Sequence, residues 1–77
     1  MVKKSGIVTI LSTTTRELAA VLAKALVKQR LVACVTIMPV RSVYRWRENV
    51  VDEDESLMIM KTREDNADTV IATTQRS

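Results

Sequence analysis

The side chains that could carry chemistry are few, and most of them are carboxylates. These 77 residues hold no histidine and a single cysteine, Cys34, which excludes a zinc finger, a Cys/His dyad and imidazole catalysis within one chain. A Gly-rich phosphate loop is excluded too, because the one glycine, Gly6, precedes a strand-like run rather than a helix. No nucleophile–base pair can be assembled from the remaining side chains. We therefore expect a protein that is not an enzyme.

Metal ligands are the next chemistry to consider, and the acidic run Asp52–Glu55 is the clearest candidate. Strand alternation would divide its four carboxylates between two opposite faces, whereas calcium needs about six to eight converging oxygens. Cys34 lies in an apolar run and is predicted to be an inert core thiol, with metal binding as the weaker alternative. Three methionines could bind copper, but their positions favour core packing: Met38, Met58 and Met60.

Lys61 is the charge that the pattern explains least, because it ends a run that is apolar from Leu57 onward. It could cap the following segment, pair with a carboxylate across a subunit boundary, or line a pocket. In the last case Lys61, Glu55 and Arg41 are the candidate ligand residues of a cleft between subunits.

The first half of the chain must position these residues on a strand, a helix and a second strand. The β-branched run Ile7–Leu11 predicts a buried strand. Thr14 and Glu17 have the spacing of a capping box, and apolar residues at helical spacing follow them: Leu18, Val21, Leu22, Ala25 and Leu26. The run Val32–Met38 predicts a second buried strand, after which Pro39 marks either an edge or a bulge.

The second half predicts a hairpin and a weaker helix. A turn at Glu48-Asn49 would connect the alternating segment after Pro39 to a third strand over Val50–Thr62, because Asn tolerates left-handed conformations. Acids in Glu64–Asp68 suit a helix N-terminus, although β-branched residues weaken the helix that follows. The order β-α-β-β-α is α+β and predicts a ferredoxin-like split β-α-β fold in one domain, residues 1–77.

The charges are divided between the two halves of the chain. Residues 1–47 contain nine of the twelve basic side chains and one acid, whereas residues 48–77 contain eight of the nine acids. With a Glu48-Asn49 loop, Arg47 would face Val50, Arg45 would face Asp52 and Val43 would face Asp54, with Arg41 diagonal to Asp54. Each such cross-strand ion pair stabilises the sheet by about 0.2–1 kcal/mol and helps to fix the register of the two strands. Because this basic stripe neutralises itself and aromatic residues are only 3% of the chain, we expect no nucleic-acid partner.

Length arithmetic bears on the hairpin that carries Tyr44 and Trp46. A compact chain of this size is roughly 30 Å across, whereas a strand from Val32 to Arg47 would run about 50 Å. The hairpin must therefore project from the domain or bend back onto it. A projecting hairpin with two exposed aromatics favours a homo-oligomer, whose interface we predict from Arg41, Tyr44, Arg45, Trp46 and Asp52.

No stretch of the sequence is apolar for the roughly 18 residues that a membrane span needs. Lys3 and Lys4 precede apolar residues, as in a signal peptide, but the run Ile7–Leu11 is too short for its apolar region. We expect a cytoplasmic protein without a membrane partner, and the free cysteine suits that compartment.

Three segments in order resemble the divalent-cation tolerance (CutA) family: Lys28–Val35, Arg41–Trp46 and Asp54–Thr62. The resemblance implies a ferredoxin-like fold, a homotrimer built by the long hairpins, and a binding or signalling role in tolerance of copper or another divalent cation. It also implies that the chain lacks a C-terminal part of the family, including the strand that would pair with the first one. A cysteine proposed as a copper ligand in some members falls where this sequence has Leu11 and Ser12. The alternative functions are a small-molecule-binding regulator that uses inter-subunit clefts and a structural or assembly factor.

Overall fold

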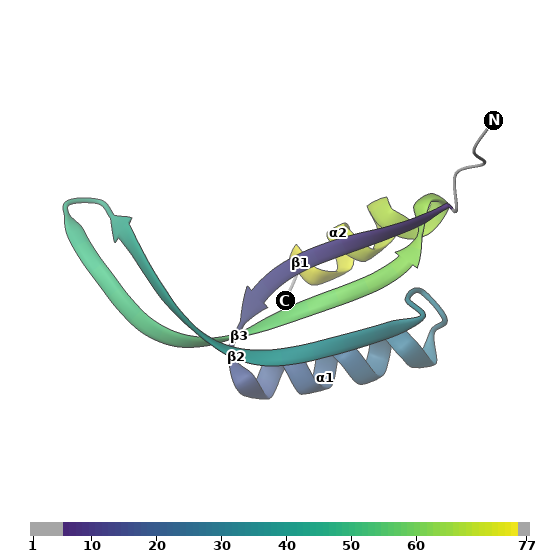
Figure 1. The fold of residues 1–77 in the computed structure, drawn as a ribbon, viewed down its shortest axis with the longest axis horizontal. Helices are drawn as coiled ribbons and strands as arrows, with labels where there is room; N and C mark the ends of the chain where they lie inside the picture. The colour runs from purple at the N-terminus through teal and green to yellow at the C-terminus, as the bar shows by residue number, and fades with distance from the viewer. Residues whose placement is uncertain (1–5, 76–77) are drawn as a thin grey trace.

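The computed structural model describes residues 6–75, so residues 1–5, with Lys3 and Lys4, and residues 76–77 lie outside the described part. Figure 1 shows a curved sheet with two helices, and a long hairpin that extends to one side. The elements in chain order are β1 (Ile7–Thr14), α1 (Arg16–Lys28), β2 (Cys34–Trp46), β3 (Asn49–Arg63), a 3-10 turn (Glu64–Asn66) and α2 (Ala67–Gln75). This order confirms the predicted α+β, split β-α-β arrangement.

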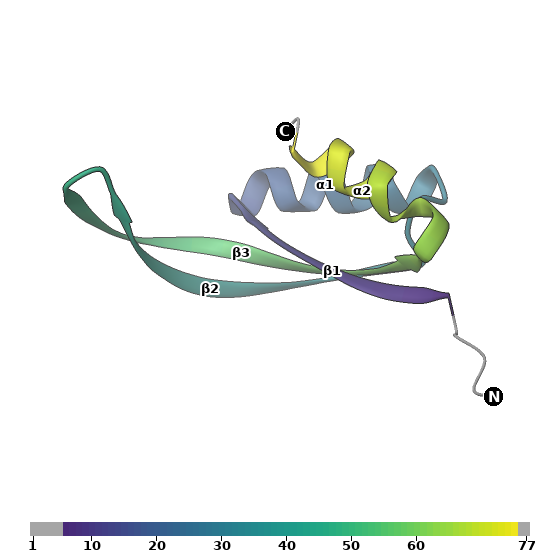
Figure 2. The same cartoon turned by 90° about the horizontal axis from the view of Figure 1, so that it is seen from above.

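The three strands form one antiparallel sheet in the order β1-β3-β2, so the longest strand is central. Figure 2 shows both helices on the same side of this sheet. The residues of β3 that alternate toward the helices are buried: Ser56, Met58, Met60 and Thr62. Together with Ala19, Leu22 and Leu26 of α1 and Val70 of α2, the two methionines form the core. The other face of the sheet has no helix over it in the described residues.

The start of α1 differs from the prediction. The N-cap is Thr15, whose Oγ1 accepts a hydrogen bond from the Leu18 N–H at 3.2 Å, while Thr14 still belongs to β1. The capping box of Thr14 and Glu17 is therefore wrong by one residue, because the strand continues farther than its apolar run. The apolar stripe is rotated slightly as well: Ala19 is buried in place of Val21, which is 63% exposed.

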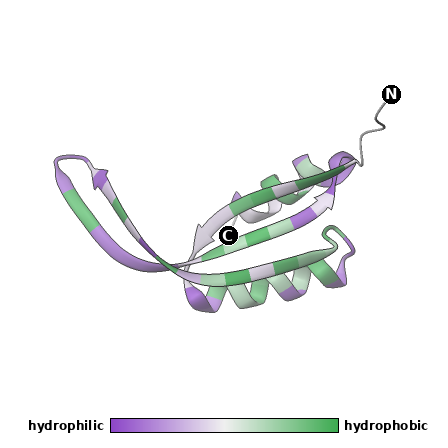
Figure 3. Ribbon diagram, viewed as in Figure 1, coloured by the Kyte–Doolittle hydropathy of each residue, from purple (hydrophilic) through white to green (hydrophobic). Residues whose placement is uncertain are grey.

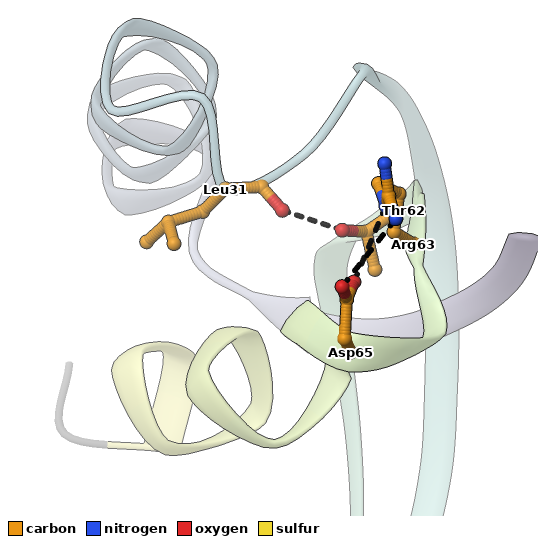
Figure 4. Close-up of polar contacts among 4 residues, drawn as sticks. All are labelled: Leu31, Thr62, Arg63 and Asp65. Carbon is orange, nitrogen blue, oxygen red and sulfur yellow. Dashed lines mark hydrogen bonds and ion pairs between the residues drawn. The ribbon is translucent and has the colours of Figure 1, made fainter. Parts of the chain in front are cut away.

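The end of α1 is tied to the end of β3. Leu31 N–H donates to the Leu26 carbonyl and Arg30 N–H to the Val27 carbonyl, both at 3.0 Å, which is the Schellman pattern. Arg30 takes the left-handed position, with φ of 59°. The buried Thr62 hydroxyl then donates to the Leu31 carbonyl, beside an Arg63–Asp65 ion pair (Figure 4). These contacts fix how the chain enters β2.

The hairpin projects, and the fold-back alternative is wrong. The Cα radius of gyration is 14.2 Å and the longest extent is 47 Å, whereas a compact chain of this length would have a radius of about 11–12 Å. Trp46 is 61% exposed at the far end of the hairpin. Figure 3 shows a hydrophilic tip of the hairpin with hydrophobic segments along both of its arms, while the strands under the helices are mostly hydrophobic.

The hairpin loop is Arg47-Glu48 rather than Glu48-Asn49, and Trp46 pairs with Asn49. The three predicted pairs are consequently wrong: Arg45 faces Val50, Val43 faces Asp52, and Arg47 lies in the loop. The true register runs without a break from Cys34↔Lys61 to the loop. A regular ladder of this length outweighs the local preference of Asn for a turn.

Several burial predictions also need correction. Cys34 is exposed, not in the core, and Met38 is 43% exposed, whereas Met58 and Met60 are fully buried as predicted. The first strand is only half covered, since Leu11 is 64% exposed. Each of the three exposed residues lies on the sheet face away from the helices. Pro39 lies on the edge strand β2 in regular register, so its edge interpretation is confirmed and its bulge interpretation is wrong.

Candidate functional site

The sheet face opposite the helices, here called the open face, is an apolar surface that no helix of the described residues covers. Strand alternation assigns it six apolar side chains, all of them exposed or half-buried: Ile7, Leu11, Met38, Val40, Leu57 and Ile59. All of them except Ile7 lie in neighbouring register positions, and an exposed apolar patch of this kind marks an interaction site. The signal in the sequence was that β1 and β3 are apolar on both faces.

The hairpin holds its shape through polar contacts between β2 and β3. Arg41 Nε and Nη2 each donate to a carboxylate oxygen of Asp52 at 2.7 Å. This contact lowers the pKa of Asp52 and raises that of Arg41. The predicted basic-against-acidic pairing is thus confirmed in kind, although Arg41 reaches Asp52 diagonally and lies directly opposite Asp54.

Tyr44 and Trp46 lie on the other face of the hairpin from Arg41. The Tyr44 hydroxyl donates to Glu53 Oε1 at 2.9 Å, and this hydrogen bond raises the pKa of Tyr44, with smaller contributions from desolvation and nearby carboxylates. The Arg47 guanidinium lies 5.8 Å from the Trp46 ring centroid, within cation–π range. Two aromatics held by such contacts, at 42% and 61% exposure, are suited to anchor a partner.

The three predicted cleft residues are not gathered in one place. Lys61 is exposed on the open face, where it pairs with Thr9 and Cys34 in register. Glu55 is six residues away along the same strand, or about 20 Å. Arg41 lies on the hairpin, so only Arg41 and Glu55 share a cavity.

That cavity, here called the hollow, is an open depression of about 820 Å³ between the N-terminus of α1 and the base of the hairpin. Its lining residues come from α1, β2 and β3: Thr15, Arg16, Glu17, Pro39, Val40, Arg41, Asp54, Glu55 and Ser56. Sequence reasoning identified Arg41 and Glu55 but missed Ser56. The signal was present, because Ser56 is a polar residue in an inward strand position beside Met58 and Met60.

Comparison with known proteins identifies the fold and the family. The sequence profile of the CutA1 divalent ion tolerance protein matches residues 7–77, nearly the whole chain. This chain belongs to the CutA1 family. The divalent-cation tolerance protein CutA of Thermus thermophilus is 45% identical over 56 residues, 71% of this chain and 54% of that protein. The human protein CutA is 38% identical over 48 residues, 61% of this chain and 27% of that protein.

Solved CutA structures have the same fold, which is ferredoxin-like. CutA from Synechococcus elongatus superposes with a TM-score of 0.88 at 33% identity, over 97% of this chain and 68% of that one. The Thermus thermophilus CutA structure gives 0.83 at 36% identity, over 91% and 70%. The chain spans about half the length of its Thermus relative in the sequence alignment, so the activity of a whole CutA1 protein enters below as a proposal.

Two further observations bear on cation and membrane binding. Within residues 6–75, no three His, Cys, Asp or Glu side chains are grouped so that they could hold a metal ion. In the same range no helix has both the length and the apolar character needed to cross a membrane.

Proposed function

We propose that this chain acts in divalent-cation tolerance as a homotrimeric binding or signalling protein without a catalytic step. Family membership supports the cation-tolerance role, and the open face supports the assembly. An apolar sheet face beside a projecting hairpin is unfavourable in water, and burial against other copies stabilises it by roughly 25 cal/mol per Å² of apolar surface. The observation that carries the proposal is the open face, with Leu11 at 64% exposure.

The hairpin supplies the anchors of the proposed trimer. Trp46 and Tyr44 would pack against a neighbouring subunit from one face of the hairpin, while Arg41, Arg45 and Asp52 would make polar contacts from its other face. Exposed aromatic residues are typical anchors of strong interface contacts.

Copper or another divalent cation is the ion to which the proposed tolerance applies. The donors of one chain do not fit a dedicated cation site, because the described carboxylates and Cys34 form no group that could hold a metal. The proposal therefore includes no metal-dependent step within a subunit. A cytoplasmic location belongs to the proposal as well, on the evidence of the free cysteine.

The test is the absolute mass in solution, measured by light scattering over a dilution series. We expect a trimer, and we expect Trp46→Ala to dissociate at higher protein concentration than the unsubstituted chain. Truncating a central aromatic anchor commonly costs about 2 kcal/mol or more of binding free energy, which is about a thirtyfold change in the dissociation constant. Val27→Ala, on the exposed side of α1, is the control and leaves the mass unchanged. A monomer at all concentrations would refute the assembly.

We propose a small-molecule-binding regulator as the second candidate function. Its support is the hollow, which brings Arg41 and Glu55 to one cavity. A CutA structure from Synechococcus elongatus is described as complexed with a Bis-Tris molecule, so a relative binds a small organic amine. A structural or assembly factor remains the function of the chain if the trimer forms and the hollow binds nothing.

A further inference from the structure

The hollow has a helix end on one side and a strand floor on the other. Its floor is three consecutive pairs of β2 and β3: Pro39↔Ser56, Val40↔Glu55 and Arg41↔Asp54. Above it, α1 begins. The first intrahelical hydrogen bond joins Ala19 N–H to the Thr15 carbonyl at 2.9 Å, so the N–H groups of Arg16 and Glu17 precede the helical ladder. Such N–H groups carry the partial positive charge of the helix.

Ser56 is the polar group under this helix end. The residue is only 5% exposed, and none of the side-chain hydrogen bonds found within residues 6–75 includes its hydroxyl. In residues 6–75, every side-chain oxygen or nitrogen atom that is inaccessible to solvent has a hydrogen-bond partner. Because the Ser56 hydroxyl has none, its oxygen must be accessible to solvent. The hollow is the surface that Ser56 lines. A buried hydroxyl that opens into a cavity, beside free helix N–H groups, is a donor set for an anionic group.

The charges of the hollow exclude a ligand that is only an anion. Arg41 is engaged by Asp52, which leaves Arg16 as the guanidinium that lines the hollow without an ion partner in residues 6–75. Asp54 on the hairpin side and Glu17 on α1 are likewise without ion partners there, whereas the Glu55 side chain lies on the open face, near Tyr44. Two carboxylates against one guanidinium would repel a simple anion. The hairpin side is therefore complementary to a cation, and the Ser56 side to an anion.

We propose that the hollow binds a small zwitterion, an organic molecule that carries both a carboxylate and an ammonium group. The carboxylate accepts hydrogen bonds from the Ser56 hydroxyl and from the N–H groups at the start of α1. The ammonium group lies against Asp54, which shares the strand face of Ser56. This inference rests on the second proposed function, since it names the ligand class of that regulator and the residues that select it.

The experiment titrates the whole chain, in its solution assembly, with four probes while amide resonances are followed by NMR. Glycine and 4-aminobutyrate are zwitterions of different length, while acetate and methylammonium each supply one end alone. We expect at least one zwitterion to shift the amides of Ser56, Arg16 and Asp54 together, and to bind about tenfold more tightly than either single-ended probe. Only simultaneous contact with both ends gives this difference.

Two variants test the two ends separately. Ser56→Ala removes the hydroxyl with little change in volume, and Asp54→Asn removes one carboxylate from an exposed position. Each should weaken zwitterion binding about tenfold. Asp54→Asn should leave acetate binding no weaker, because it touches only the cation end. Glu48→Gln, in the hairpin loop, is the matched control and should change nothing.

The proposal fails if the zwitterions cause no shift in the hollow, if acetate alone matches them, or if contacts with a neighbouring subunit fill the hollow. These results are separable from failure of the proposed functions. Binding of a neutral polyol in the hollow would overturn the zwitterion but keep the small-molecule regulator. Absence of any ligand beside a normal trimer mass would remove the regulator and leave the cation-tolerance proposal standing.

Discussion

Two arginines in the described residues, Arg30 and Arg47, hold a positive φ that L-residues adopt at a cost. Arg30 occupies the left-handed position of the Schellman motif, where glycine has no Cβ penalty. We predict that Arg30→Gly raises the free energy of unfolding by about 1 kcal/mol. Urea denaturation at one fixed protein concentration measures it. Lys28→Gly, inside the last turn of α1, is the control and should lower stability by a similar amount.

Tyr44 offers a second test at this scale, because it is the one tyrosine of the sequence. Its hydroxyl donates to Glu53, which raises its pKa. The contact thus stabilises the fold below the unfolded pKa of about 10, and this stabilisation is lost as the pH rises through the folded pKa. Glu53→Gln should lower the pKa of Tyr44, as read by ultraviolet absorbance against pH. An unchanged pKa in Glu53→Gln, or an equal fall in Glu48→Gln, would contradict the contact.

At the scale of elements, the N-cap of α1 is where the structure differs from the sequence-based prediction. Thr15 Oγ1 accepts the Leu18 N–H, whereas the Thr14–Glu17 spacing had suggested a capping box one residue earlier. We predict that Thr15→Ala costs about 1 kcal/mol of stability, with Thr14→Ala costing less, because Thr14 caps nothing and ends β1. Chemical denaturation of both variants measures this difference. A larger loss in Thr14→Ala would restore the capping box.

The order and type of the elements could be read from the sequence, because periodicity and capping residues are local signals. The register could not. Asn49 made Glu48-Asn49 the preferred turn, but the unbroken pairing from Cys34↔Lys61 to Trp46↔Asn49 places the loop at Arg47-Glu48. Register depends on the whole ladder, and moving it by two residues keeps every side chain on its face. The hydrophobic pattern therefore could not distinguish the two registers, and local turn preference decided wrongly.

Burial was also beyond local signals, for a related reason. Cys34 and Met38 lie in apolar runs, which predict a buried strand, yet both are exposed in one chain. An apolar run indicates that both faces of the strand are apolar. It does not indicate which element, or which other chain, covers each face. Ser56 shows the converse. Its inward position was readable, but the hollow that it lines exists only where α1 begins above β3.

At the scale of the whole molecule, the length of the strands predicted the shape better than the residue patterns did. The expected strand of about 50 Å agrees with a longest extent of 47 Å, and the exposed Trp46 confirms that the hairpin projects. The same chain leaves a sheet face uncovered. These two features place the apolar surface and the aromatic anchors of one subunit where another subunit could reach both.

The open face gives the last prediction a closely matched control. Leu11 and Val21 are 64% and 63% exposed, but Leu11 lies on the open face and Val21 on the outer surface of α1. Leu11→Glu should dissociate the proposed trimer, because assembly would bury an unpaired carboxylate. Val21→Glu introduces the same charge at the same exposure and should leave the trimer intact. Light scattering over a dilution series measures both, and circular dichroism confirms that each subunit stays folded. Equal dissociation by both variants would mean that the helices, not the open face, form the contact; no dissociation by Leu11→Glu would leave the hairpin as the whole of the interface.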